Sequence, residues 1–372
     1  MIPFNIPVVI GREIDYLKEA LANRKLSGDG PFTKKCSAWF EHRYQFKKTF
    51  LTTSCTDALE LCALLCELQP GDEVLIPSYT FVSTANPFVL RGAKLVFADS
   101  MAENPNIDVQ QLESLITPRT KAIALVHYAG IACDMDAIMA LAKKHNLLVV
   151  EDAAQAIDSF HNGKPLGSIG HLSAFSFHET KNIVTGEGGM AVINDERFKD
   201  RAEIIREKGT NRSRFFRGEV DKYGWVDVGS SFLPSELIAA YLMAQLEALD
   251  TIQEKRKAIW QVYWDAFQQI KGKVQLPYLP SYATNNAHMF YLGCESLAQR
   301  TELVARLKSK NIHAVFHYLS LHQSEFYKDK HDGRDLPNAD RWTDVLLRLP
   351  LYYDLTLDQA SMVAEEVVAF FK

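Results

Sequence analysis

The stretch that decides the fold is Leu147-Leu148-Val149-Val150-Glu151-Asp152-Ala153-Ala154-Gln155. Four apolar residues in a row, two of them valines, are typical of a strand whose two faces are both covered. Asp152 comes where that strand ends, and in open parallel sheets ligands bind outside the carboxyl ends of the strands. Asp152 is therefore a candidate site residue, although taken alone it is better explained as the cap of a following helix.

Working outward from this stretch, short apolar runs alternate with helical patterns. We expect strands at 49–52, 73–77, 94–99, 122–126, 147–150, 174–177 and 190–193, and helices that include 57–68, 84–90 and 136–144. Strands that alternate with helices predict crossover connections, and therefore an α/β fold with a mostly parallel sheet. Two further helices are expected before the first strand, at 14–22 and from residue 33.

After residue 233 the pattern changes. Pro234 suits the first turn of a helix, and the apolar spacing predicts a long, bent helix that runs to about residue 270. Looser elements follow, with strands at 290–292 and 313–316 and helices at 302–310 and 357–371. We therefore expect a large domain at residues 1–240, with an N-terminal helical segment, and a smaller C-terminal α+β domain at residues 241–372.

Composition excludes several classes of protein. The 372 residues include 41 basic and 46 acidic ones, a net charge of −5, which argues against a nucleic-acid partner held by bulk positive charge. No run of eighteen apolar residues predicts a membrane span, and the N-terminus lacks the blocks of a signal peptide. The six cysteines have no CxxC spacing and are expected to be reduced thiols in a cytoplasmic protein without a metal site.

Lys181 gives Asp152 a second interpretation. The expected strand 174–177 is followed by His178-Glu179-Thr180-Lys181-Asn182 and then by the turn Gly186-Glu187-Gly188-Gly189. A lone loop lysine is usually a solvated charge. A lysine at the end of a buried strand, near an acid at the end of another, fits a Schiff-base site better, because desolvation lowers its pKa and frees the amine as a nucleophile.

A third segment, Thr52-Thr53-Ser54-Cys55-Thr56-Asp57, joins a strand to a helix. Hydroxyls and free N–H groups at a helix N-terminus form an anion site, although an ordinary N-cap explains this segment equally well when it is taken alone. Neither a Walker loop nor a GxGxxG motif after a strand is present. An amine, an acid and a phosphate cradle together are what pyridoxal 5'-phosphate requires.

Segments 151–155, 176–182 and 186–189 resemble the DegT/DnrJ/EryC1/StrS family of sugar-nucleotide aminotransferases, and the likeness runs from Met1 to Leu351. It implies the fold-type-I architecture of pyridoxal phosphate enzymes. It also implies a homodimer with shared active sites, in which L-glutamate donates an amino group to a nucleotide-linked keto sugar. Segments 77–84, 126–130, 208–213 and 215–218 narrow the expected acceptor to a dTDP-linked 4-keto-6-deoxy-D-glucose.

The resemblance also implies roles for single residues. Lys181 would hold the cofactor and move the proton, and Asp152 would pair with the ring nitrogen. The other expected cofactor contacts are Gln155 near the ring hydroxyl, Phe81 stacked on the ring, and Cys55, Thr56 and Ser176 on the phosphate. Ser231 stands where many members carry an Asn that reaches the partner's cofactor, so that a hydroxyl replaces an amide there.

Two further groups are candidates for substrate contacts. Five basic residues lie between Arg206 and Arg217, and this loop is either solvated or dimer-facing, or it binds a diphosphate or a carboxylate through Arg212 and Arg214. Histidines surround the end of the expected strand 313–316. Without a carboxylate or cysteine pattern, Tyr318 and His322 fit sugar-nucleotide contacts and packing better than a metal site.

Alternatives to this function remain within and outside the family. A related transaminase could make the C4 epimer or a 3-amino sugar. A non-catalytic, cofactor-binding regulator is the alternative from a different class, and the complete set of Lys181, Asp152 and Ser176 argues against it.

Overall fold

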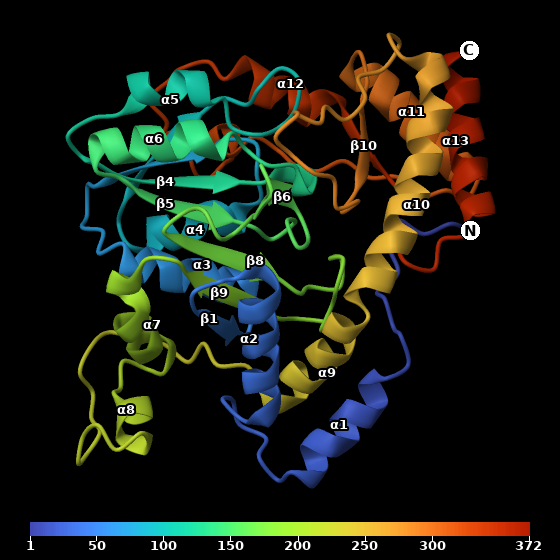
Figure 1. Cartoon of the computed structure of the whole chain (residues 1–372). Coiled ribbons are helices and arrows are strands. Elements are labelled where there is room, and N and C mark those ends of the chain that lie inside the picture. The colour runs from blue at the N-terminus through green and yellow to red at the C-terminus, as the bar shows by residue number, and fades with distance from the viewer.

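A seven-stranded sheet forms the centre of the computed structural model, which describes residues 1–372 (Figure 1). The strands are β1 (Thr49–Thr52), β2 (Glu73–Pro77), β3 (Lys94–Ala98), β4 (Thr120–Val126), β5 (Leu148–Asp152), β8 (Leu172–Ser176) and β9 (Gly189–Ile193). Their order is β1-β9-β8-β5-β4-β2-β3, and β9 alone runs against the others. The predicted α/β fold with a mostly parallel sheet is confirmed.

Helices cover both faces of this sheet, which is why its strands are buried along most of their length. Alternate strand residues such as Leu75 and Ile123 pack under α5 (Val109–Leu115) and α6 (Met135–His145). Their neighbours Val74 and Ile76 point to the other face and pack under α3 (Cys55–Leu65) and α4 (Val82–Leu90). Figure 1 shows α5 and α6 together on one side of the sheet and α3 on the opposite side.

The remaining helices flank this core. They are α1 (Glu13–Ala22), α2 (Pro31–Tyr44), α7 (Lys199–Arg206), α8 (Arg212–Phe216), α9 (Glu236–Glu247), α10 (Leu249–Phe267), α11 (Leu297–Ser309), α12 (Pro337–Val345) and α13 (Leu357–Phe371). Two antiparallel pairs complete the fold: β6 (Phe160–His161) with β7 (Lys164–Pro165), and β10 (Phe290–Gly293) with β11 (Leu346–Leu349). Helix α9 packs on α1 and α2, whereas α10 packs on α13.

Two expectations for the C-terminal part differ from the structure. The long helix is two helices that break at Ala248. The strand at 313–316 does not form: Val315 alone pairs, with Arg348 of β11, and the N–H of His313 bonds to the carbonyl of Ile2. The boundary at residue 240 stays a prediction.

Side chains close both edges of the large sheet. On β1, Glu41 accepts the N–H of Thr49 at 2.9 Å. Arg206 donates to the carbonyl of Leu51, also at 2.9 Å. On β3, the hydroxyl of Tyr327 accepts an N–H at 2.7 Å, and Arg334 donates to a carbonyl at 2.8 Å. Tyr327 and Arg334 come from the C-terminal part of the chain, so the β3 edge also joins the two parts.

One buried carboxylate fixes the start of α2. Glu236, the first residue of α9, is 1% exposed and accepts the N–H groups of Gly30, Phe32 and Thr33 at 3.0, 2.7 and 3.0 Å. These are N–H groups that a helix start leaves without a partner, and a negative charge is favourable there. A Cβ on Gly30 would lie 2.5 Å from this carboxyl group, so a larger residue there would displace the carboxylate.

We expect Glu236→Ala to lower the free energy of unfolding by about 3 kcal/mol, because three buried N–H groups lose their acceptor. Urea denaturation of the cofactor-free protein measures the change. Glu254→Ala, an exposed glutamate on α10, is the control and should change the free energy by less than about 0.5 kcal/mol. Equal effects of the two variants would contradict the capping role.

Candidate active site

A cavity of about 470 Å³ opens at the carboxyl ends of β5 and β8, between the large sheet and the segment that precedes α12. Residues that the sequence singled out and that line it are Cys55, Thr56, Phe81, Asp152, Gln155, Ser176, Lys181 and Tyr318. Sequence reasoning missed other lining residues: Phe4, Thr84, His288 and Arg348. The strand-end rule therefore located the pocket, whereas His288 and Arg348 of the C-terminal part were not anticipated.

Lys181 lies in the loop after β8, where its side chain is half-buried in the wall of the pocket. Its N–H bonds to the carbonyl of His178 at 2.9 Å, and the next residue, Asn182, is buried and donates to Gln253 at 2.7 Å. These bonds hold the loop in place. Burial lowers the pKa of Lys181, and the charge of Arg348 lowers it further, against the opposing effect of Asp152.

Asp152 ends β5, and its carboxylate has two donors. Thr84 donates its hydroxyl at 2.7 Å, and Ala154 donates its N–H at 3.0 Å. Burial raises the pKa of Asp152, while these two hydrogen bonds and the charge of Lys181 lower it. The hydrogen bond to Ala154 corresponds to the capping role that the sequence also suggested for Asp152. The same carboxylate lines the pocket as well.

The N-terminus of α3 faces the same pocket. Ser54 is its N-cap and accepts the N–H of Asp57 at 3.0 Å, whereas the N–H groups of Cys55 and Thr56 have no acceptor in the chain. Gly189 of β9 packs against this turn, since a Cβ there would lie 2.4 Å from the nitrogen of Cys55. Two free N–H groups at a helix N-terminus form a cradle for a phosphate group.

Three side chains form the outer part of the pocket. Gln155 accepts the N–H of Ala129 at 2.6 Å and donates to the hydroxyl of Tyr318 at 3.4 Å. The Phe81 ring lies 5.7 Å from that of Tyr318 and is 52% exposed, which leaves an aromatic face available at the mouth. Burial raises the pKa of Tyr318, so its hydroxyl stays protonated and can donate.

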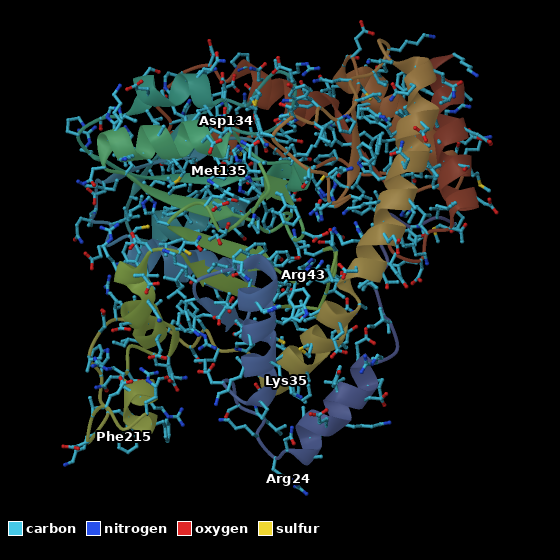
Figure 2. All side chains as sticks on the ribbon, in the orientation of Figure 1. Arg24, Lys35, Arg43, Asp134, Met135 and Phe215 are labelled. Carbon is cyan, nitrogen blue, oxygen red and sulfur yellow. The ribbon has the colours of Figure 1, made fainter.

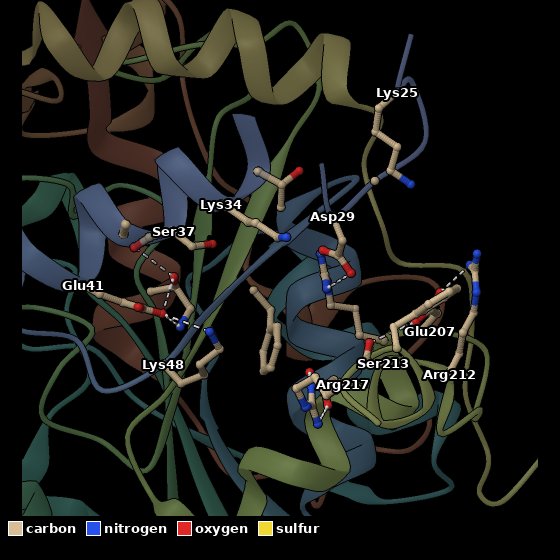
Figure 3. A pocket seen from close by; sticks show the side chains of 18 residues that line it. Lys25, Asp29, Lys34, Ser37, Glu41, Lys48, Glu207, Arg212, Ser213 and Arg217 are labelled. Carbon is tan, nitrogen blue, oxygen red and sulfur yellow. Dashed lines mark hydrogen bonds and ion pairs between the residues drawn. The ribbon is translucent and has the colours of Figure 1, made fainter. Parts of the chain in front are cut away.

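The basic loop lies in a different place from this pocket. Arg212, Ser213 and Arg217 line a second cavity of about 630 Å³, beside the edge strand β1 (Figure 3). Arg212 pairs with Glu207 at 2.8 Å, and Arg214 pairs with Glu219 at 3.2 Å. The positive charge that the sequence shows in this loop is therefore largely neutralised by neighbouring acids.

Two other candidates also lie outside the pocket of Lys181 within one chain. His322 is buried, and its Nδ1 lies 2.7 Å from the hydroxyl of Ser78. Ser231 is exposed and pairs through its backbone with Glu207.

Arg348 is the missed residue that a sequence signal could have revealed. It is the one charged residue in the buried strand β11, whose sequence is Leu-Leu-Arg-Leu. A charge within such a strand is rarely buried without a functional or structural partner. Thr84 and His288 carry no comparable signal.

The residues present fit pyridoxal phosphate: a desolvated amine, a carboxylate at a strand end and a phosphate cradle converge on one pocket of a largely parallel α/β sheet. These features define the class of fold-type-I pyridoxal phosphate enzymes. The profile of the DegT/DnrJ/EryC1/StrS aminotransferase family matches residues 8–368, and the chain belongs to that family.

Known relatives extend over nearly the whole chain. It is 35% identical to the spore coat polysaccharide biosynthesis protein SpsC of Bacillus subtilis, covering 98% of this chain and 96% of that protein. It is 30% identical to the GDP-perosamine synthase of Escherichia coli O157:H7, with 100% and 98% covered. The putative sugar aminotransferase Spr1654 of Streptococcus pneumoniae in its PMP form superimposes with a TM-score of 0.91 at 27% identity, covering 100% and 99%. The cofactor is therefore pyridoxal phosphate.

None of the helices is both long and apolar enough to span a bilayer. All six cysteines are free thiols, and five of them are buried.

We expect Lys181→Met to stabilise the cofactor-free protein, because the native pocket disfavours the ammonium form. The pKa of Lys181 is lower in the folded protein than in the unfolded chain. The free-energy cost of burying its charge is therefore fully present at low pH, and it disappears as the pH rises from the folded-state pKa to the unfolded-state pKa. The gain in unfolding free energy should therefore be larger at pH 6 than at pH 10. Urea denaturation at both pH values measures it, and a gain that grows with pH would contradict the desolvation argument.

Proposed function

We propose that this chain transfers the amino group of L-glutamate to the C4 carbonyl of dTDP-4-keto-6-deoxy-D-glucose, giving dTDP-4-amino-4,6-dideoxy-D-galactose and 2-oxoglutarate. The observation that carries the transamination is the convergence of Lys181, Asp152 and the free N–H groups of α3 on one pocket. Each group has a separate part in such a reaction, and a mere binding protein has no need of a desolvated amine.

When bound, pyridoxal phosphate supplies a carbonyl that condenses with amines and a ring that accepts electrons from the adjacent carbon. Lys181 would anchor it, and its amine would take the proton from the donor's Cα. In the second half-reaction the same amine would deliver a proton to C4 of the keto sugar. A lowered pKa keeps part of Lys181 unprotonated and able to act as this base, and a positioned base contributes about 10²–10⁴-fold to rate.

The remaining residues hold the cofactor and orient it. Asp152, oriented by Thr84, would keep the ring nitrogen protonated, so that the ring remains an electron acceptor. Cys55 and Thr56, with Ser176, would bind the phosphate at the N-terminus of α3. Phe81 would cover one ring face, and Gln155, already bonded to Ala129, would lie near the ring hydroxyl.

The particular acceptor rests on sequence likeness. Segments 77–84, 126–130, 208–213 and 215–218 resemble dTDP-4-amino-4,6-dideoxygalactose transaminase, an enzyme of enterobacterial common antigen synthesis. A GDP-linked keto sugar is the second candidate, since GDP-perosamine synthases are among the relatives. Both acceptors are 4-keto-6-deoxy sugars and differ in the nucleotide and in configuration.

We also propose a homodimer in which the segment around α8 reaches the partner's pocket. This segment exposes large apolar side chains, and Phe216 and Trp225 are 69% and 84% exposed. Figure 2 shows Phe215 at the outer end of the segment, far from the central sheet. Exposed aromatic residues at a projecting end are typical of an interaction surface. In the dimer, Arg212, Arg214 and Ser231 would meet the partner's nucleotide sugar and cofactor phosphate, whereas Tyr318 would contribute from the same chain.

We expect Lys181→Ala to abolish amino transfer, with a loss of at least 10²-fold, because it removes both the covalent anchor and the base. The assay is 2-oxoglutarate release from L-glutamate, followed together with the visible absorbance of the bound cofactor. Lys121→Ala, an exposed lysine on β4, is the control and should retain activity. Full activity of Lys181→Ala would rule out this mechanism.

Asp152→Asn should lose most activity while the protein stays folded, because the amide cannot keep the ring nitrogen protonated. Circular dichroism and urea denaturation establish folding, and the single-turnover rate with L-glutamate measures the effect. An unchanged rate would show that Asp152 only caps the turn at Ala154.

The acceptor is tested by supplying L-glutamate with dTDP-4-keto-6-deoxy-D-glucose or with GDP-4-keto-6-deoxy-D-mannose. We expect turnover with the dTDP sugar, and an axial amino group at C4 of the product by NMR. Turnover with the GDP sugar alone would replace the proposed acceptor, and an equatorial amino group would assign the C4 epimer. If L-glutamate leaves the cofactor unchanged, the chain is not a glutamate-dependent transaminase.

A further inference from the structure

The imidazole of His288 lies in the wall of the pocket that holds Lys181, with one ring nitrogen bonded and the other free. His288 is 3% exposed, and its Nδ1 lies 2.9 Å from the side-chain oxygen of Asn182. Its Nε2 has no partner in the chain and remains accessible from the pocket. What this nitrogen can do depends on whether it carries a proton.

Two neighbouring amides decide where the proton of this imidazole lies. The side-chain nitrogen of Asn182 donates to the backbone carbonyl of Asn286 at 2.9 Å and to the side-chain oxygen of Gln253 at 2.7 Å. A backbone carbonyl can only accept, so the oxygen of the Asn182 amide is the atom that faces His288. That oxygen also accepts, and the donor is therefore Nδ1–H of His288. In the neutral ring Nε2 then carries a lone pair and no proton.

The charges around this ring keep it neutral. Burial holds the pKa of His288 well below its usual value, and the charges of Lys181, Arg348 and Arg256 lower it further. The two side chains that complete the hydrogen-bonded network, Asn182 and Gln253, are uncharged. His288 therefore offers the pocket a hydrogen-bond acceptor and cannot act there as a proton donor at neutral pH.

The backbone on both sides of the imidazole is fixed. The N–H of His288 bonds to the side chain of Asn286 at 3.0 Å, and Arg256 donates to the carbonyl of His288 at 2.8 Å. Asn182, which bonds to the ring, is the residue directly after Lys181 in the chain. The same network therefore holds the imidazole and the loop of the lysine in one arrangement.

Other acceptors in this pocket already have donors. Asp152 accepts two hydrogen bonds, and the side-chain oxygen of Gln155 accepts a backbone N–H. Nδ1 of His317 accepts from Arg348 at 2.7 Å. The free imidazole nitrogen is therefore an acceptor without a donor, in the same cavity as the amine of Lys181.

We propose that Nε2 of His288 accepts a hydrogen bond from the ε-amino group of Lys181 whenever that amine is free, and that His288 is thereby a positioning residue for proton transfer. This assignment rests on the proposed function. Both side chains line one cavity, and the flexible four-carbon stem of lysine lets the amine reach the fixed imidazole. Because Nε2 only accepts, the amine must donate to it. The lone pair of the amine stays available for a substrate proton, and the hydrogen bond orients it.

Two substitutions of His288 separate this role from a structural one. In His288→Asn the amide nitrogen takes the place of Nδ1–H, so the bond to Asn182 is kept and the acceptor at Nε2 is lost. In His288→Gln the longer side chain places an oxygen near the position of Nε2 and loses the bond to Asn182. We expect His288→Asn to lower the saturated single-turnover rate with L-glutamate at least about tenfold and His288→Gln to keep it within about threefold. The half-maximal L-glutamate concentration should change in neither.

The cofactor-free protein supplies a readout that is independent of turnover. The pH dependence of Lys181 acetylation by acetic anhydride, followed by mass spectrometry of its peptide, reports the pKa of Lys181. Loss of an acceptor destabilises the ammonium form, so His288→Asn should lower this pKa, and His288→Gln should leave it near the wild-type value. Mere loosening of the pocket would hydrate the amine and raise the pKa. His313→Asn, at an exposed histidine outside the pocket, is the control and should change neither pKa nor rate.

Nitrogen NMR of histidine-labelled, cofactor-free wild-type protein tests the tautomer without any substitution in the measured sample. We expect Nδ1 of His288 to carry the proton, and the Nε2 signal to move over the pH range in which Lys181 loses its proton. A proton on Nε2, or an Nε2 signal that ignores the titration of Lys181, would overturn the inference. This measurement stands even if neither variant of His288 folds, which thermal unfolding establishes.

The variants have equally definite outcomes. If His288→Gln loses the rate while His288→Asn keeps it, His288 acts only through its bond to Asn182 and the inference is wrong. A raised L-glutamate requirement at an unchanged rate would assign His288 to donor binding instead. If the wild type does not react with L-glutamate although Nε2 responds to Lys181, the proposed function fails while the hydrogen bond stands.

Discussion

Desolvation of Lys181 is the constraint on which the rest of the pocket depends. A lysine in water is almost fully protonated at neutral pH, and only removal from water or nearby positive charge frees the amine. The sheet alone cannot exclude water, because the carboxyl ends of its strands are open. The segment that carries His317 and Tyr318 closes them: the hydroxyl of Tyr79 accepts the N–H of Tyr318 at 2.8 Å, and Tyr128 donates to the carbonyl of His317 at 3.0 Å. The C-terminal part therefore helps to shield the amine of Lys181 from water.

The elements that could be predicted from the sequence are those with a local cause. Strands such as β2 and β5 are recognisable because both of their faces are covered. Asp152 and Lys181 became candidates because one ends such a strand and the other lies in the loop after another. The pairing of Val315 with Arg348 depends on contact between distant segments, so no local pattern predicts it. Likewise, which of the candidate residues share a pocket follows from the fold and not from spacing.

Charge illustrates the same difference between sequence and structure. The loop from Arg206 to Arg217 is strongly basic, yet its arginines pair with acids from neighbouring segments and with Glu207 of the loop itself. Arg348 is a single charged residue in an apolar strand and belongs to no basic cluster in the sequence. Its guanidinium nevertheless has no acidic partner. Whether a cation stays unpaired depends on which residues the fold places beside it. An acidic neighbour neutralises the cation in an ion pair, whereas burial without such a neighbour leaves its charge unpaired.

The closed edges of the sheet have a consequence for how the chain behaves before and after folding. An exposed edge strand offers a row of N–H and carbonyl groups to any other extended chain, and strand addition of this kind leads to aggregation. Here the side chains of Glu41 and Arg206 occupy backbone groups on β1, and those of Tyr327 and Arg334 do so on β3. The β1 edge is covered from within the first 206 residues of the chain. The β3 edge stays open until residues beyond 326 have been synthesised and packed, so the nascent protein is most vulnerable to wrong strand pairing at β3.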